Sequence, residues 1–272
     1  GAWNRISRLT EAEKARGVVA YSSGNHAQAV ACAAQILGIE AIIVMPADSP
    51  KVKVEGVIGF GGEVRMYDRY TESREAIGEE IAASKGSILV RPFDDPFVIE
   101  GQGTTGLEIL EQADGPLDQL LCGASGGGLI AGINLTMETL SHETRVIGVE
   151  PEAYNDTLLS LAAGERVTHA PVERPSICDA LMTDRPGELT FPINQRLTGV
   201  VTVSDAEVAA AVAYAFKVLK LVVEPGGAVS LAAVLAGKVE TRGLTTAVVL
   251  SGGNVDPSVF SAIIENRFTP GA

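Results

Sequence analysis

Cysteine is scarce in this sequence. The chain has three, Cys32, Cys122 and Cys178, which are widely spaced and stand among apolar residues. An odd number of distant cysteines does not make a disulfide framework, and the spacing does not match a zinc site. We therefore expect three buried free thiols in a cytoplasmic protein.

Basic residues are few relative to acidic ones. Lysine and arginine total 21 against 34 aspartates and glutamates, which gives a formal net charge of −13. A surface of this sign repels phosphate backbones and anionic lipid headgroups. We therefore expect neither nucleic acid nor a membrane as a partner.

Long hydrophobic runs are also lacking. Runs such as residues 41–45 and 247–250 have the length of a strand, whereas a membrane span needs about 20 apolar residues. No signal-peptide pattern opens the chain, which supports the cytoplasmic assignment. The chain starts Gly-Ala-Trp-Asn without Met, in a segment that already has a helical pattern. We expect that further residues of the protein precede it.

The sequence does contain a regular alternation of short apolar runs and amphipathic stretches. After the run GVVAY, apolar residues recur at positions 27, 30, 31, 34 and 37, which is the spacing of one helix face. Uninterrupted apolar strands separated by helices are typical of parallel sheets covered on both faces. Because the strands are unevenly spaced, a closed barrel is disfavoured. We predict an α/β fold with open, mostly parallel twisted sheets and helices on both faces.

Two breaks in the pattern, near Gly17 and near residues 92–96, indicate the domain organisation. Residues 17–95 are predicted to form a small domain. Residues 1–16 and 96–272 are predicted to form a larger one.

Three clusters of small residues follow predicted strands: SSGNH at 22–26, ASGGGL at 124–129 and SGGN at 251–254. Ligands of open parallel sheets bind at the carboxyl ends of the strands. Each cluster alone could also be purely structural: a packed or capping histidine for His26, a tight turn for the glycine run, and a helix cap for Ser251. A glycine run before a helix presents N–H groups that suit one phosphate. It matches neither the dinucleotide pattern G-x-G-x-x-G nor a P-loop, which disfavours a nicotinamide-dependent enzyme.

Taken together, the stretches YSSGNHAQA, GQGTTGLEIL, SGGGLIAGI, VEPGGAVSLAA and VVLSGGNVD resemble the pyridoxal-phosphate-dependent threonine/serine dehydratase and serine racemase family. The resemblance spans essentially the whole chain. It implies the fold-type-II architecture, similar to the tryptophan synthase β subunit, with two open sheets. It also implies pyridoxal 5'-phosphate as cofactor, a small-molecule amino acid as substrate, and a homodimer.

The resemblance assigns cofactor-binding residues one by one. Asn25 would bind the phenolic oxygen of the cofactor, and Ser251 the pyridine nitrogen. A neutral hydroxyl at that nitrogen favours elimination over reactions that need a long-lived carbanion. The phosphate would be held by the backbone N–H groups of Ser125, Gly126, Gly127, Gly128 and Leu129.

The resemblance also places the substrate carboxylate in the SSGNH loop, with Ser22, Gly24 and His26 as binding residues. Ser23 would be the catalytic residue facing the α-carbon, and its hydroxyl needs activation by the site. Arg74 matches a family arginine that can reach the substrate side; a solvated helix arginine is the alternative. Glu224 lies where the family has an acid near the ring, or else caps a turn.

A divalent-cation site follows from the same resemblance. It would use the carboxylates of Glu150 and Asp156 and the backbone carbonyl of Tyr154. Oxygen ligands of this kind suit Mg²⁺ or Ca²⁺. From their spacing alone, Glu150 and Asp156 would be read as two surface carboxylates.

The family's S-F-K-x-R-G-A motif, whose lysine carries the cofactor, is absent; the match begins at Gly1, which places that lysine three residues upstream. We expect β-elimination of water from a 3-hydroxy amino acid such as threonine or serine. Serine racemase and 3-hydroxyaspartate dehydratase are the alternatives within the family. A non-catalytic phosphate-binding protein is the alternative if the protein truly lacks the lysine.

Overall fold

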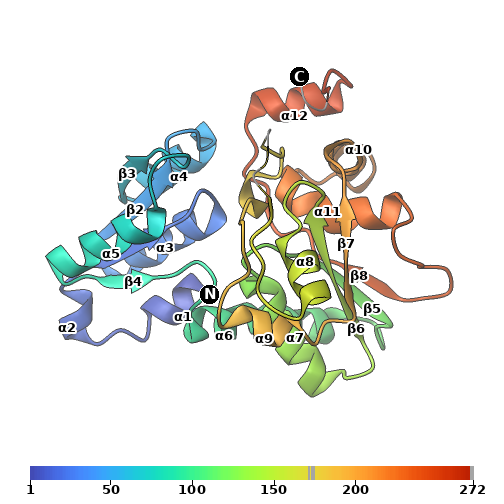
Figure 1. The fold of residues 1–272 in the computed structure, drawn as a ribbon, viewed down its shortest axis with the longest axis horizontal. Coiled ribbons are helices and arrows are strands. Elements are labelled where there is room, and N and C mark those ends of the chain that lie inside the picture. The colour runs from blue at the N-terminus through green and yellow to red at the C-terminus, as the bar shows by residue number, and fades with distance from the viewer. Residues whose placement is uncertain (171, 173–174, 270–272) are drawn as a thin grey trace. The chain divides into compact units, whose positions relative to one another are not determined.

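The computed structural model describes residues 1–170, 172 and 175–269, and the chain forms two compact units, Gly1–Gly101 and Gln102–Ala272 (Figure 1). Each unit is a parallel sheet with helices on both faces. The predicted α/β class with two open sheets is therefore confirmed.

The first unit is built on a four-stranded sheet of order β3-β2-β1-β4 in which all pairs are parallel. Its elements are α1 (Ala2–Ile6), α2 (Glu11–Lys14), β1 (Val18–Tyr21), α3 (Asn25–Leu37), β2 (Ala41–Pro46), α4 (Lys51–Gly59), β3 (Glu63–Tyr67), α5 (Arg74–Lys85), β4 (Ile88–Val90) and the start of α6 (Pro96–Gln112).

Alternate residues of the central strands supply the two core layers of this unit, because successive side chains of a strand point to opposite faces. Val18 and Ala20 of β1 join Ile43 of β2 beneath α1, α3 and α4. On the other face, Tyr21 and Val44 pack with the apolar side of α5. Both faces of β1 and β2 are thus buried from solvent, which explains their uninterrupted apolar sequences.

The second unit repeats this plan with the order β7-β6-β5-β8, again all parallel. After the end of α6 its elements are β5 (Gln119–Gly123), α7 (Gly128–Leu140), β6 (Arg145–Pro151), α8 (Asp156–Ala163), a 3-10 turn (Asp179–Leu181), α9 (Thr190–Asn194), β7 (Gly199–Val203), α10 (Asp205–Tyr214), a π-helical turn (Ala215–Leu219), α11 (Pro225–Leu235), β8 (Thr246–Val248) and α12 (Pro257–Ile264).

The strands of this second sheet divide their side chains between two core layers in the same way. Leu121 and Val149 point to the layer formed with α10 and α11. Leu120 and Cys122 point to the layer formed with α7. In both units the strand order reverses at the first strand: β1 lies between β2 and β4, and β5 lies between β6 and β8. Loops that leave adjacent strands in opposite directions open a crevice at this point, where ligands of such sheets bind.

Helix α5 begins at Arg74, because Ser73 caps it by accepting a hydrogen bond from the Ala76 N–H at 3.2 Å. Two sequence-based expectations differ in detail from the structure. The last strand ends at Val248 rather than at Ser251. Cys122 and Cys178 are buried as expected, but Cys32 is only partly buried; all three are free thiols.

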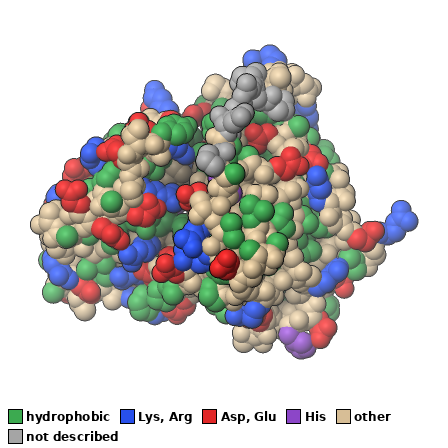
Figure 2. All heavy atoms as spheres, in the orientation of Figure 1, with side chains coloured by type: hydrophobic (Ala, Val, Ile, Leu, Met, Phe, Trp, Pro, Cys, Tyr) green, Lys and Arg blue, Asp and Glu red, His purple; other side chains and the backbone are tan. Residues whose placement is uncertain are grey.

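The N-terminal helix α1 packs with α3 in the first unit, where Ala2 and Ile6 are core residues. The assignment of residues 1–16 to the larger domain, made from the sequence, stays a prediction. Across the described residues, no helix has both the length and the apolar composition that a membrane crossing requires. Acidic and basic side chains are interspersed on the face seen in Figure 2.

Ile43 and Ile36 make a matched test of the first core. Ile43 is fully buried in β2, whereas Ile36 on α3 is 65% exposed. We expect Ile43→Ala to lower the free energy of unfolding by about 3 kcal/mol, because it leaves a cavity in a close-packed layer. Ile36→Ala should change it by less than about 0.5 kcal/mol. Urea unfolding measures both, and equal effects would contradict this core.

Candidate active site

The SSGNH loop lies at the strand reversal of the first unit. The Ser22 N–H donates to the Val44 carbonyl at 3.1 Å, which ties the loop to the neighbouring strand β2. The Gly24 N–H donates to the Ser22 hydroxyl oxygen at 3.2 Å, and the Ala27 N–H donates to the Gly24 carbonyl at 3.0 Å. The Ser22 hydroxyl accepts here and still has its proton to donate. These bonds form a short turn that starts α3 directly after β1.

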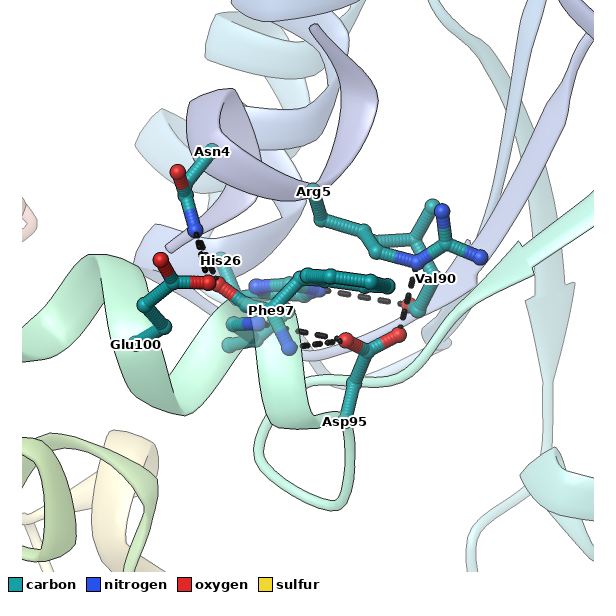
Figure 3. A network of polar contacts seen from close by, with 8 residues as sticks. Asn4, Arg5, His26, Val90, Asp95, Phe97 and Glu100 are labelled. Carbon is teal, nitrogen blue, oxygen red and sulfur yellow. Dashed lines mark hydrogen bonds and ion pairs between the residues drawn. The ribbon is translucent and has the colours of Figure 1, made fainter. Parts of the chain in front are cut away.

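His26, on the first turn of α3, points across the strand reversal toward β4 (Figure 3). Its Nε2 lies 3.3 Å from the Val90 carbonyl oxygen. Because a carbonyl only accepts, Nε2 carries the proton. Burial lowers the pKa of His26 to about 4, so that the ring is neutral at pH 7. The family resemblance implies that His26 binds the substrate carboxylate; in the structure its ring connects the loop to β4.

The connection after β4 is held by a polar network that Figure 3 shows. Asp95 accepts hydrogen bonds from the N–H groups of Phe97 and Val98 at 2.8 and 3.2 Å, which caps the start of α6. Arg5 pairs with the same carboxylate at 2.8 Å. The Asn4 amide donates to the Phe97 carbonyl at 2.7 Å. Helix α1 therefore fixes the segment that follows β4.

Arg74 is the first residue of α5 and is neither fully solvated nor unpaired. Its guanidinium lies 5.7 Å from the centre of the Tyr21 ring and forms an ion pair with Glu75 at 2.7 Å. Tyr21 directly precedes Ser22. Arg74 is thus near the carboxyl end of β1, partly buried against an aromatic face.

In the second unit, residues 125–129 join β5 to α7 at the strand reversal. Among the described residues, none of these five N–H groups donates a hydrogen bond. Gly127 has a φ of +89°, and a Cβ there would overlap the Asn194 amide nitrogen. Only glycine fits this position. Unpaired N–H groups at the start of a thirteen-residue helix suit an anion, so the residues present fit a phosphate.

Several buried polar side chains behind this loop were not assigned a role by the sequence analysis. The hydroxyls of Ser125 and Thr183 are 2.6 Å apart. Thr190 and Asn194 of α9 donate to the carbonyls of Gly126 and Gly127 at 2.5 and 3.2 Å. Thr190 and Asn194 stand more than 60 residues after the loop, on the short helix α9, and no local pattern links them to it.

Ser251 is exposed in the irregular segment that follows β8. The adjacent Gly252 accepts a hydrogen bond from the Glu224 N–H at 3.0 Å, and a Cβ on Gly227 would lie 2.7 Å from the Gly252 carbonyl. The segment therefore lies against the start of α11. Glu224 is buried at the first boundary of α11, but its side chain makes no capping hydrogen bond.

Glu150 and Asp156 are fully buried, unlike the surface carboxylates that their spacing alone suggests. Glu150 accepts the N–H groups of Thr157 and Leu158 at 3.0 and 2.9 Å, so it caps α8. Neither carboxylate oxygen of Asp156 has a hydrogen-bond partner in the described structure. Burial, and then the nearby Glu150 charge, raise the pKa of Asp156 to about 9.

Asp156 is a buried carboxylate with two unsatisfied oxygens, close to a second buried carboxylate, and therefore requires either a proton or a cation. The described residues include no cluster of three or more His, Cys, Asp and Glu side chains suited to a metal. A cation here would therefore use these two carboxylates together with backbone or water oxygens. That donor set fits Mg²⁺ or Ca²⁺.

Comparisons with known proteins agree with these features. Residues 1–252 match the family described as pyridoxal-phosphate dependent enzyme. The chain is 41% identical to the L-threo-3-hydroxyaspartate ammonia-lyase of Saccharomyces cerevisiae, over 98% of this chain and 81% of that protein. It is 39% identical to the catabolic L-threonine dehydratase of Escherichia coli, over 97% of this chain and 80% of that protein. The structure of maize serine racemase superposes with a TM-score of 0.89 at 35% identity, covering 98% of this chain and 82% of that one.

The raised pKa of Asp156 predicts a pH-dependent stability. The unfolded chain releases this proton near pH 3.8, whereas the folded protein retains it up to about pH 9. The folded state therefore binds more protons in this window, and the free energy of unfolding must fall as the pH rises, by up to about 1.4 kcal/mol per unit. Burial also raises the pKa of Glu150 to about 7, so the two carboxylates share this fall below pH 7 and Asp156 alone accounts for it between about pH 7 and 9. Asp156→Asn should remove the fall in that upper range, measured by urea unfolding with a chelator present. The exposed Asp114→Asn is the control, and an unchanged slope in Asp156→Asn would refute the assignment.

Proposed function

Because this chain belongs to the pyridoxal-phosphate dependent enzyme family and has its fold-type-II architecture, we propose that the protein removes water from a 3-hydroxy amino acid such as L-threonine or L-serine. The products are a 2-oxo acid and ammonia. The observation that carries the proposal is the set of unpaired N–H groups at residues 125–129, at the strand reversal of the second sheet.

Pyridoxal 5'-phosphate supplies the electron sink for this chemistry when bound. In our proposal the N–H groups of residues 125–129 bind its phosphate. Asn25 binds the phenolic oxygen and the Ser251 hydroxyl binds the ring nitrogen. A hydroxyl, unlike a carboxylate, does not hold a proton on that nitrogen, and this favours elimination.

The SSGNH loop binds the substrate carboxylate in this proposal. Ser22 offers its hydroxyl proton, because the oxygen already accepts the Gly24 N–H. His26 holds the loop against β4 as a neutral ring, which adds no charge beside the substrate. Ser23 faces the α-carbon on the side opposite the family's lysine, which removes the α-proton, and acts as a second proton donor or acceptor. The lysine that completes the reaction is expected in the S-F-K-x-R-G-A motif, which these 272 residues do not contain.

Three further properties belong to the same proposal. Glu150, Asp156 and the Tyr154 carbonyl hold Mg²⁺ or Ca²⁺, which would neutralise the buried carboxylates. The protein is a homodimer, and it acts in the cytoplasm. The cation site is supported by Asp156, because its buried carboxylate has two oxygens without a hydrogen-bond partner in the described structure.

The proposal is tested by assaying the product 2-oxo acid and ammonia, with protein expressed from its complete coding sequence. L-Threonine, L-serine and 3-hydroxyaspartate are supplied in turn with pyridoxal 5'-phosphate. We expect 2-oxo acid and ammonia in equal amounts, and Ser23→Ala should slow the reaction by at least about 100-fold, within the range of a proton-transfer group. Exchange of enantiomers without 2-oxo acid would instead identify a racemase. Absence of both reactions would refute the enzyme.

The hydroxyaspartate reaction is a second candidate, which Arg74 favours. 3-Hydroxyaspartate carries a second carboxylate, and a guanidinium binds a carboxylate in a two-point geometry. Arg74 lies against Tyr21, next to the SSGNH loop. Two similar proteins, from Saccharomyces cerevisiae and a Pseudomonas species, are named L-threo-3-hydroxyaspartate ammonia-lyase.

If Arg74 binds the second carboxylate, Arg74→Met should raise the KM for 3-hydroxyaspartate about tenfold or more, since a charged hydrogen bond is worth roughly 1.5–3 kcal/mol. The KM for L-serine should change less than about twofold. Arg65→Met removes the same charge from an exposed arginine of the same unit and is the control. An equal rise in KM for both substrates would contradict this role.

A further inference from the structure

Residues 125–129, the glycine loop, have carbonyl groups that accept hydrogen bonds from residues not assigned to any site. The Gly126 carbonyl accepts the Thr190 hydroxyl at 2.5 Å and the Gly187 N–H at 3.3 Å. The Gly127 carbonyl accepts the Asn194 amide at 3.2 Å, besides the Ala131 N–H of its own helix at 2.9 Å. Two successive peptide groups are thus fixed by side chains of one short helix, α9.

Fixing a carbonyl also fixes an N–H group. A peptide unit is planar and trans, so that the carbonyl of one residue and the N–H of the next point in opposite directions. The Thr190 bond to the Gly126 carbonyl therefore orients the Gly127 N–H away from α9. By the same geometry, the Asn194 bond to the Gly127 carbonyl orients the Gly128 N–H away from it. These are two of the N–H groups without a partner among the described residues.

The contact between α9 and the loop is close and is buried from solvent. Thr190 is 0% exposed and Asn194 is 1% exposed. A Cβ on Gly127 would lie 3.1 Å from the Thr190 hydroxyl oxygen and would overlap the Asn194 amide nitrogen. The space behind the loop is therefore filled, and the loop cannot rotate its peptide groups without breaking buried hydrogen bonds.

We propose that Thr190 and Asn194 are positioning residues, which aim the N–H groups of Gly127 and Gly128 at the cofactor phosphate. They thereby set how strongly the protein prefers the phosphorylated cofactor over its unphosphorylated form. This inference rests on the proposed function of residues 125–129. Neither side chain touches the phosphate, because both contact the loop through its carbonyl side.

The test is a pair of dissociation constants, for pyridoxal 5'-phosphate and for pyridoxal, measured by equilibrium dialysis on protein from the complete coding sequence. The dissociation constant for pyridoxal divided by that for pyridoxal 5'-phosphate reports the contribution of the phosphate alone. Thr190→Val removes the hydroxyl at nearly constant volume and should reduce this ratio on the order of tenfold, the effect of one buried hydrogen bond. Thr190→Ser keeps the hydroxyl and should stay within about twofold of the parent. The ³¹P resonance of the bound cofactor should shift in Thr190→Val and not in Thr190→Ser.

Two further variants complete the test. Asn194→Leu removes the second donor and should also reduce the ratio, so the test does not depend on one variant folding. Thr139→Val is the matched control, because the Thr139 hydroxyl donates only to the Leu135 carbonyl of its own exposed helix surface, at 2.8 Å.

The possible failures are distinguishable. Folded Thr190→Val and Asn194→Leu proteins with the parent ratio would overturn the inference alone. Equal weakening for both ligands would also overturn it, since that result indicates a general structural defect. A parent protein without preference for the phosphorylated ligand would contradict the proposed function of residues 125–129 and this inference with it.

Discussion

Each candidate site depends on the parallel pairing of one central strand with neighbours on both sides. Because β1 pairs with β2 and β4, and β5 pairs with β6 and β8, both sheets reverse their strand order beside the first strand. The loop that leaves that strand enters a helix at once, where the first N–H groups have no intrahelical partner. Small residues are required there because the backbone itself has to meet the ligand. SSGNH and ASGGG satisfy this requirement in the two units.

The polar groups behind these loops are as well defined as the loops. Asp95 caps α6 and pairs with Arg5, while the neutral His26 bonds to Val90. In the second unit, α9 holds the glycine loop through buried hydrogen bonds, and Glu150 caps α8. Buried polar groups are stabilising only when they are paired. Asp156 departs from this rule, with two unsatisfied oxygens among the described residues, and it therefore indicates a proton or cation at that place.

Much of the fold followed from sequence periodicity, since apolar runs such as AIIVM are long enough only for strands and too continuous for a solvated face. The three loop clusters were also found, because a run of glycine and serine between a strand and a helix indicates a backbone that approaches a ligand closely. Contacts distant in sequence were not predictable. Nothing near Thr190 or Asn194 indicates the loop more than 60 residues earlier, and nothing near His26 indicates Val90. The spacing of Glu150 and Asp156 suggested surface residues, whereas both are buried. Their burial was not predictable, because it depends on the packing of α8 and not on the local sequence.

The most direct test of the account is a crystal structure of the protein from its complete coding sequence, grown with pyridoxal 5'-phosphate. We expect phosphate oxygens within about 3 Å of the backbone nitrogens of residues 125–129, the distance of an N–H···O hydrogen bond. We also expect that the bonds from Thr190 and Asn194 to the loop carbonyls are kept. A phosphate bound elsewhere, with these N–H groups in contact with water or protein, would contradict the account.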